Sequence, residues 1–253
     1  MPGGVLLEDL TWIEAEGVLT PTSIVVLPIG ASSKEHGPHL KLKNDWSLAE
    51  YWKRRLLERA NIVVAPTIGF HYYPAFTEYP GSISLRLETA RDLVIDICRS
   101  LARFGPRRFY ALNTGVSTVR ALAPAAEALA AEGVLLGYTD IGALLGPLKK
   151  TLCEQEGGTH ADEAETSMML VIDPLSVDMS KAVKDFREDR PGGLTRDPAG
   201  AGTYSPTGIW GDPTLASRAK GEALVNVFLE GLLRDIDALR GADLPGSGAR
   251  GGR

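Results

Sequence analysis

The sequence has few of the residues that build disulfide frameworks or cysteine-rich metal sites. It contains two cysteines in 253 residues, Cys98 and Cys153, and neither lies within ligand spacing of a histidine. Two isolated thiols exclude a disulfide framework and argue against a Cys-rich zinc site. We therefore expect both side chains to be buried or chemically idle.

Long apolar runs and clusters of basic residues are also missing. No stretch reaches the roughly 18 apolar residues of a membrane span, and the first residues lack the basic and apolar regions of a signal peptide. The formal net charge is −5 and no segment is rich in Lys or Arg. The sequence therefore lacks the basic segments that nucleic-acid binding needs. We expect a cytoplasmic protein with neither a membrane nor a nucleic-acid partner.

Strand and helix signals alternate along most of the chain. Apolar or β-branched runs predict strands at 23–29, 61–68, 83–85, 108–112 and 134–139, and amphipathic patterns predict helices at 44–60, 88–104, 117–132 and 219–239. This alternation predicts a single-domain layered α/β/α fold with a mostly parallel central sheet over residues 1–240. The composition of residues 241–253 is typical of a disordered tail. Ligands of such folds gather at the carboxyl ends of the strands.

One segment is too long and too rich in Gly and Pro to be a plain connector. It runs from Asp185 to Ser217 and carries the aromatic residues Tyr204 and Trp210. Loops of this length are usually functional. We expect an arm that covers the pocket of its own or a neighbouring subunit.

Polar side chains concentrate directly after the first predicted strand. The segment KEHGPHLKLKND places Glu35, His36, His39 and Asp45 within eleven residues. Imidazole and carboxylate groups so close together can converge on one divalent cation. In the alternative interpretation, Asn44 and Asp45 only cap the following helix and the rest is polar loop.

A second cluster, THADEAETSMML, leads into an apolar helical run. It contains His160, Glu163 and Glu165, and a His-x-x-Glu pair shares one helix face if the helix has already begun. The alternative is a capping box, because Asp162 and Glu165 have the spacing that starts a helix. Spacing alone leaves both interpretations open.

Taken together, these two segments resemble the signature regions of the creatininase family. The intervening FTEYPGSISL is similar to that family's Pro-Gly-Thr-x-Ser-Leu segment, and LNTG stands where the family usually has an Asn-Gly-His loop. The resemblance covers nearly the whole chain. It implies a layered α/β fold, a homo-oligomer that is commonly a hexamer, and hydrolysis of cyclic or linear amides with one or two divalent metals.

The resemblance also implies roles for particular residues. His36 and Asp45 match a ligand histidine and the metal-bridging aspartate, with the nine-residue separation intact. His160 matches the histidine that carries a proton beside the substrate, and Glu165 matches a glutamate that is a plausible ligand.

Two positions depart from the family pattern. The ligand glutamate position is Lys34, and Glu35 can replace it only if it points inward, because adjacent residues of an extended loop point to opposite sides. The position of another ligand histidine falls at Asn113-Thr114-Gly115. The resemblance therefore implies a variant with one Zn or Mn ion per chain, or with none.

The expected function is metal-assisted hydrolysis of a C–N bond in a small polar substrate. Lys34 would stabilise the developing oxyanion. Contacts with the substrate are expected from the following residues: Tyr72, Phe76, Asn113 and Trp210. The alternatives are a catalytically degenerate binding or scaffolding protein with the creatininase fold, and a metal-free lyase or isomerase that uses Lys34 and His160.

Overall fold

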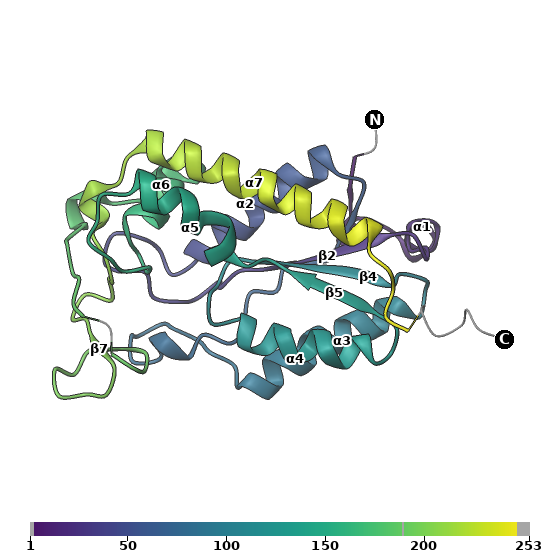
Figure 1. Ribbon diagram of the computed structural model, residues 1–253, viewed down its shortest axis with the longest axis horizontal. Coiled ribbons are helices and arrows are strands. Elements are labelled where there is room, and N and C mark those ends of the chain that lie inside the picture. Colours follow the sequence, from purple (N-terminus) through teal and green to yellow (C-terminus); the bar gives the residue numbers. More distant parts are fainter. Residues whose placement is uncertain (1–2, 189, 247–253) are drawn as a thin grey trace.

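A five-stranded parallel sheet forms the centre of the protein in the computed structural model, which describes residues 3–188 and 190–246 (Figure 1). The strand order is β1-β3-β2-β4-β5. The strands are β1 (Val5–Leu6), β2 (Ile24–Ile29), β3 (Val63–Val64), β4 (Arg108–Asn113) and β5 (Leu135–Tyr138). Because all pairs are parallel, the carboxyl ends of the strands lie at one edge of the sheet.

Strand β2 shows why the sheet needs helices on both faces. All six of its residues are buried. Ile24 and Val26 belong to the apolar cluster on one face, whereas Val25 and Leu27 belong to the cluster on the other. Side chains alternate between the two faces of a strand, so a continuous apolar run is covered on both sides.

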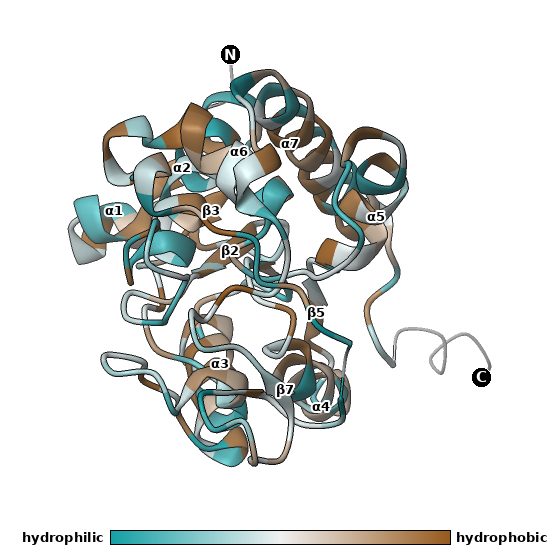
Figure 2. Ribbon diagram, turned by 90° about the vertical axis from the view of Figure 1, so that its left-hand side faces the viewer, coloured by the Kyte–Doolittle hydropathy of each residue, from teal (hydrophilic) through white to brown (hydrophobic). Residues whose placement is uncertain are grey.

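Two layers of helices supply that cover. One layer contains α2 (Asn44–Arg59), α5 (Ile141–Leu152), α6 (Glu163–Ile172) and α7 (Arg218–Gly241), and the other contains α3 (Leu87–Ala102) and α4 (Val119–Ala130). Figure 2 shows the two layers end-on, on either side of the sheet. The short helix α1 (Trp12–Val18) lies near the end of the molecule where the strands begin (Figure 1). The expected layered α/β/α fold with a parallel sheet is confirmed.

Shorter elements complete the chain. They are η1 (Leu7–Asp9), η2 (Pro74–Phe76), η3 (Pro174–Ser176), η4 (Met179–Lys181), β6 (Leu194–Thr195), β7 (Thr203–Tyr204) and η5 (Pro213–Leu215). No helix among the described residues is both long and apolar enough to cross a membrane. Cys98 is buried, Cys153 is half-buried, and both are free thiols.

One sequence expectation about an element was wrong. Residues 83–85 form no strand, because Ile83 and Leu85 donate their backbone N–H groups to the loop carbonyls of Ser33 and His71. For α5 the sequence indicates only an apolar helix pattern near Cys153, without bounds, because Gly and Pro within the helix lower its propensity. The tail predicted from residue 241 begins at the last residue of α7, and its residues 247–253 lie outside the described part of the chain.

The Asp185–Ser217 arm folds back over the edge of the sheet where the strands end. It contains the two-stranded parallel β6–β7 pair and forms two antiparallel bridges, His160 with Trp210 and Asp185 with Gly211. The first bridge joins the arm to the residue that the sequence singles out as the proton carrier.

Candidate metal centre and substrate cavity

The loop between β2 and α2 brings three consecutive side chains into the interior. Lys34, Glu35 and His36 are 5%, 6% and 1% exposed. Gly30 makes the tight connection possible, because a Cβ atom there would lie 2.3 Å from the backbone oxygen of Asp45. The end of β2 therefore touches the first turn of α2.

His36 is held between a backbone carbonyl and two carboxylates. Its Nδ1 lies 2.9 Å from the carbonyl oxygen of Lys34, which only accepts, so Nδ1–H donates. Its Nε2 lies 2.8 Å from Asp45 Oδ1 and 3.4 Å from Glu165 Oε1. Burial alone would lower the pKa of His36, but the two carboxylates outweigh it and raise the pKa to about 9. The space around Nε2 therefore favours a cation, either a proton or a metal ion.

Lys34 forms an ion pair with the second carboxylate oxygen of Asp45. Its Nζ lies 2.7 Å from Asp45 Oδ2 and 4.6 Å from the centroid of the Phe76 ring. Burial opposes ionisation of Asp45, but the charges of Lys34 and His36 hold its pKa below the usual range. One carboxylate thus joins two cationic side chains.

Glu165 lies in the first turn of α6, and its side chain faces His36. Its backbone N–H donates to Asp162 Oδ1 at 2.9 Å, which is the expected cap. Its side chain accepts from the N–H of Ala161 at 2.8 Å and from Asn44 Nδ2 at 2.9 Å. The cap interpretation is therefore confirmed for Asp162. The interpretation of a His-x-x-Glu pair on one helix face is wrong, because α6 begins at Glu163, after His160.

The expected capping role of Asn44 or Asp45 is wrong. The residue before α2 is Lys43, and no side chain caps this helix. The side chains of both residues instead turn to the buried cluster, where Asn44 contacts Glu165 and Asp45 contacts His36.

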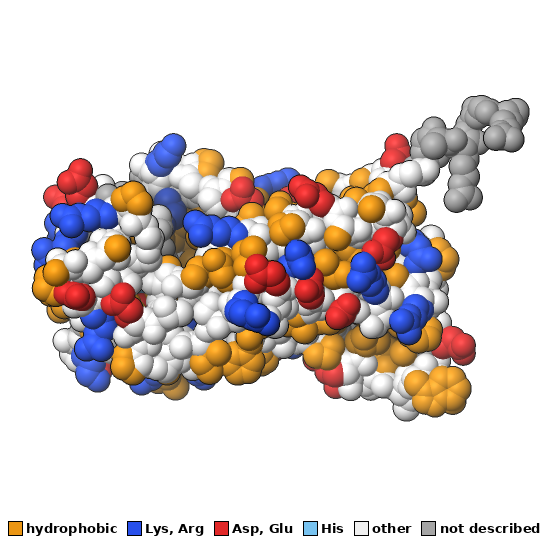
Figure 3. Space-filling model, turned by 90° about the horizontal axis from the view of Figure 1, so that it is seen from below, with side chains coloured by type: hydrophobic (Ala, Val, Ile, Leu, Met, Phe, Trp, Pro, Cys, Tyr) orange, Lys and Arg blue, Asp and Glu red, His pale blue; other side chains and the backbone are white. Residues whose placement is uncertain are grey.

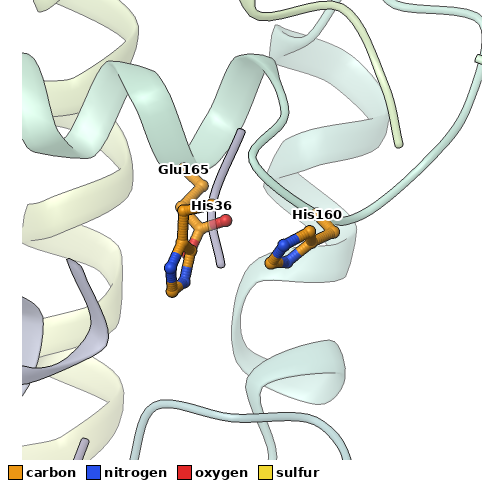
Figure 4. A group of neighbouring side chains, drawn as sticks. All are labelled: His36, His160 and Glu165. Atoms are coloured by element: carbon orange, nitrogen blue, oxygen red, sulfur yellow. The ribbon is translucent and has the colours of Figure 1, made fainter. Parts of the chain in front are cut away.

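His160 lies beside this cluster and pairs with Glu35. Its Nε2 is 3.0 Å from both Oε2 and the backbone oxygen of Glu35. Its ring centroid lies 5.0 Å from that of His36 and 4.2 Å from that of Phe76. Figure 4 shows the side chains of His36, His160 and Glu165 close together. Ligand atoms of these three residues lie within 4.8 Å of one another, so the three could hold a metal ion.

Glu35 points inward and pairs with His160, but it is not among the residues whose ligand atoms converge in that group. Its carboxylate accepts from the N–H of Gly37 and from His160. Gly208 of the arm, at φ +82°, covers it so closely that a Cβ atom there would lie 2.1 Å from Oε1. This placement suits a partner of His160 better than a metal ligand.

The centre opens into a cavity of about 530 Å³. Lys34, His160, Glu165, Phe76 and Trp210 lie in its wall. The arm contributes Leu194, Thr203 and Trp210 to the same wall, so it covers the pocket of its own chain as expected.

Two residues expected to contact the substrate lie elsewhere. Tyr72 and Asn113 are not among the described residues that line the cavity. The amide of Asn113 is used within its own loop, where it donates to the carbonyl of Gly115 and accepts from Thr118 Oγ1. These placements differ from the expectation for both residues.

Tyr73 is a neighbour of the site that sequence reasoning missed. Its side chain is 2% exposed, and its ring centroid lies 5.6 Å from Lys34 Nζ. Burial, reinforced by the charge of Asp45, raises the pKa of the hydroxyl well above its usual value. The aromatic residues around Tyr72 in the sequence indicate that a ring of this segment could lie at the site. The sequence pattern does not show which of these rings points into the protein.

The fold and the centre together define a layered α/β protein with a cluster of His36, Asp45 and Glu165 at the carboxyl edge of its parallel sheet. Residues 8–236 match the family model described as creatininase, creatinine amidohydrolase, and the chain therefore belongs to the creatininase family. The family expected from the sequence motifs is confirmed.

Curated relatives and solved structures cover almost the whole chain. The creatinine amidohydrolase of Pseudomonas putida is 29% identical over 259 residues, with 95% of this chain and 98% of the relative covered. A mycofactocin precursor peptide peptidase of Mycobacterium tuberculosis is 28% identical over 224 residues, with 84% of each chain covered. A structure named "Creatininase Mn" has a TM-score of 0.80 at 26% identity and covers 94% of this chain and 100% of its own. A mutant creatininase of "Zn-Zn type" has a TM-score of 0.78 at 26% identity, with 94% and 99% covered.

Proposed function

We propose that this protein hydrolyses a C–N amide bond with the help of one divalent cation, Zn²⁺ or Mn²⁺. The observation that carries the proposal is the position of His36 Nε2 between two carboxylate oxygens while Nδ1 is tied to a backbone carbonyl. The names of the relatives support the reaction type, because one is an amidohydrolase and another a peptidase.

The residues present fit one ion. A ligand histidine usually donates its second ring nitrogen to a carbonyl or carboxylate, as His36 does. With Asp45 and Glu165 it offers one nitrogen and two carboxylates, a ligand set that suits both proposed metals. A second ion does not fit, because the ammonium of Lys34 already lies 2.7 Å from Asp45 Oδ2 and would repel it.

When bound, the ion supplies the charge that makes a water molecule acidic enough to attack an amide near neutral pH. In the net reaction the water oxygen bonds to the carbonyl carbon, the C–N bond breaks, and a proton lost by the water passes to the leaving nitrogen. His160, oriented by Glu35 at 3.0 Å, is placed to deliver that proton. Lys34 lies in the cavity wall and is placed to stabilise the negative charge on the carbonyl oxygen.

One observation favours the alternative of a binding or scaffolding protein without catalysis. Without a metal, protonated His36 and Lys34 balance the charges of Asp45 and Glu165. Such a closed network of ion pairs would need no ion. The metal content of the purified protein separates the two functions.

The test compares the natural protein with His36→Ala and Asp45→Asn. We expect about one metal per chain in the natural protein and loss of both metal and amide hydrolysis in the two variants, with creatinine and short peptides as substrates. Asp92→Asn, an exposed aspartate that pairs with Arg91, is the matched control. Full metal content and unchanged hydrolysis in Asp45→Asn would rule out this centre, and no metal after supplementation would favour the binding protein.

A further inference from the structure

One face of helix α5 forms a wall of the cavity. The residues that line it recur at helical spacing and are Ile141, Gly142, Leu145, Gly146, Lys149 and Lys150. Leu145 also belongs to the apolar cluster that includes residues of α7, and Leu144 and Leu148 pack against that cluster. The helix therefore joins the core to the cavity and presents a continuous face to the ligand.

Beyond the metal centre the cavity is lined by large apolar side chains. Trp52, Leu145, Met168 and Phe228, from four different helices, lie in its wall and are each at most 6% exposed. The indole N–H of Trp52 has no hydrogen-bonding partner within the described part of the chain. A volume of about 530 Å³ lies in the range of about 300–1,000 Å³ that suits a drug-sized ligand. The cavity is larger and more apolar than the small polar substrate expected from the sequence requires.

The charges around the cavity are unequally satisfied. Lys34 pairs with Asp45, and Lys149 pairs with Asp162 at 2.9 Å. Arg120 and Lys150 also line the cavity, are exposed, and have no acidic partner among residues 3–188 and 190–246. Figure 3 shows a hollow beside the arm with hydrophobic side chains inside and Lys or Arg side chains at its border. In a chain of net charge −5, two unpaired cations at a cavity favour an anionic group on the ligand.

We propose that the substrate is an amide that carries a bulky apolar side chain and a free carboxylate, as an N-acyl amino acid or the carboxyl end of a short peptide does. The apolar side chain lies against α5, Trp52 and Phe228, and the carboxylate pairs with Arg120 and Lys150. The proposal rests on the proposed function for its reacting bond, but its recognition part is measured by binding alone.

The test titrates three probes into the metal-loaded full-length protein by calorimetry: N-acetyl-phenylalanine, N-acetylglycine and N-acetyl-phenylalanine amide. Burial of the phenyl group predicts that N-acetyl-phenylalanine binds about 10-fold to 100-fold more tightly than N-acetylglycine. Loss of the carboxylate predicts weaker binding of the amide. Equal binding of the three probes, or no binding of any, would overturn the proposal.

Gly146→Leu is the sharpest variant, because a Cβ atom at this cavity position meets nothing within 4 Å and leucine favours the helix. It should remove the preference for the phenyl group, and Gly146→Ala should reduce it less. Gly17→Leu, in α1 and with equally open space, is the matched control. If Gly146→Leu keeps both the circular dichroism spectrum and the tighter binding of N-acetyl-phenylalanine over N-acetylglycine, the phenyl group does not lie against α5. That result would overturn the proposal.

The carboxylate is tested by Arg120→Ala combined with Lys150→Ala, with exposed Arg103→Ala as the control. The double variant should bind N-acetyl-phenylalanine and its amide equally, and retained discrimination would overturn this part of the proposal. Hydrolysis of the same probes is measured separately. If the protein distinguishes the probes in binding but hydrolyses none of them, the inference about recognition stands and the proposed function is contradicted. If it hydrolyses the probes but binds them equally, the proposed function stands and the inference about recognition is contradicted.

Discussion

At the scale of single residues, we propose that the charge of Lys34 limits how many cations the buried centre can hold. Its ammonium pairs with one carboxylate oxygen of Asp45, and His36 pairs with the other. Removing a buried cation from such a pair leaves the carboxylate without compensation, which costs about 3–5 kcal/mol. A metal ion can supply the compensation instead.

Lys34→Met should therefore destabilise the metal-free protein and raise its affinity for Mn²⁺, whereas Lys34→Glu should add a ligand and a second bound ion. Thermal unfolding without metal and calorimetric titration with Mn²⁺ measure the two effects. Lys41→Glu, an exposed lysine of the same loop, is the control. Unchanged affinity in both Lys34 variants would show that Lys34 does not compete with metal.

Pairing Lys34→Glu with Gly115→His restores both residues of the family pattern. A Cβ atom at Gly115 would lie 3.2 Å from Thr118 Cγ2 and 3.4 Å from Tyr73 Cε1, so both neighbours must move slightly. We expect the double variant to bind the second ion more tightly than Lys34→Glu alone. A double variant with the affinity of Lys34→Glu would mean that the imidazole does not reach the ion.

His71, which is not among the candidate ligands, makes the stability depend on pH. Burial lowers the pKa of His71 from 6.5 to about 4. The unfolded chain therefore binds this proton first, so the contribution of neutral His71 is complete above pH 6.5 and is lost as the pH falls to 4. Urea unfolding at pH 7 and pH 4 measures this. The free energy of unfolding should fall by about 3 kcal/mol less in His71→Leu than in the natural protein. Identical losses would contradict the burial effect.

At the scale of elements, the arm depends on close backbone contact. Gly158, at φ +91°, lies so near the arm that a Cβ atom would be 2.1 Å from the carbonyl oxygen of Trp210. Gly158→Ala should separate the arm from His160, lower the stability by at least about 2 kcal/mol and reduce hydrolysis. Chemical denaturation and limited proteolysis of the arm measure this, with Gly17→Ala in α1, where a Cβ atom meets nothing within 4 Å, as control. An arm as protease-resistant as in the natural protein would contradict the prediction.

The elements that the sequence predicts best are those with one dominant physical signal. The buried run of β2 and the stripe of α2 are such cases, and together they bring His36 within 2.8 Å of Asp45. The bounds of α5 could not be predicted, because its Gly and Pro residues have low helix propensity and tertiary packing outweighs it.

The direction of Glu35 could not be predicted either. Alternation along an extended loop would turn it away from its neighbours, yet Lys34, Glu35 and His36 are all buried. The reason lies about 170 residues away in sequence, because Gly208 of the arm covers Glu35 from the side that alternation would leave to solvent. Contacts this distant are not contained in a local pattern.

At the scale of the whole molecule, we propose a homo-oligomer, a hexamer by family resemblance. Large apolar side chains lie exposed on the described chain, among them Trp12 at 77% and Leu175 at 97%. Light scattering at micromolar concentration should give a mass close to six times the mass of one chain. A monomer under these conditions would contradict the proposal but would leave the metal centre untouched.

We propose that one chain holds one catalytic divalent cation, with the ammonium of Lys34 in place of a second. The decisive measurement removes all metal from the purified protein and titrates it with Mn²⁺ or Zn²⁺ while amide hydrolysis is followed. Activity should return in full at one ion per chain, and Asp45→Asn should neither bind the ion nor recover activity. Full activity in the metal-free protein, or activity that requires two ions per chain, would contradict the proposal.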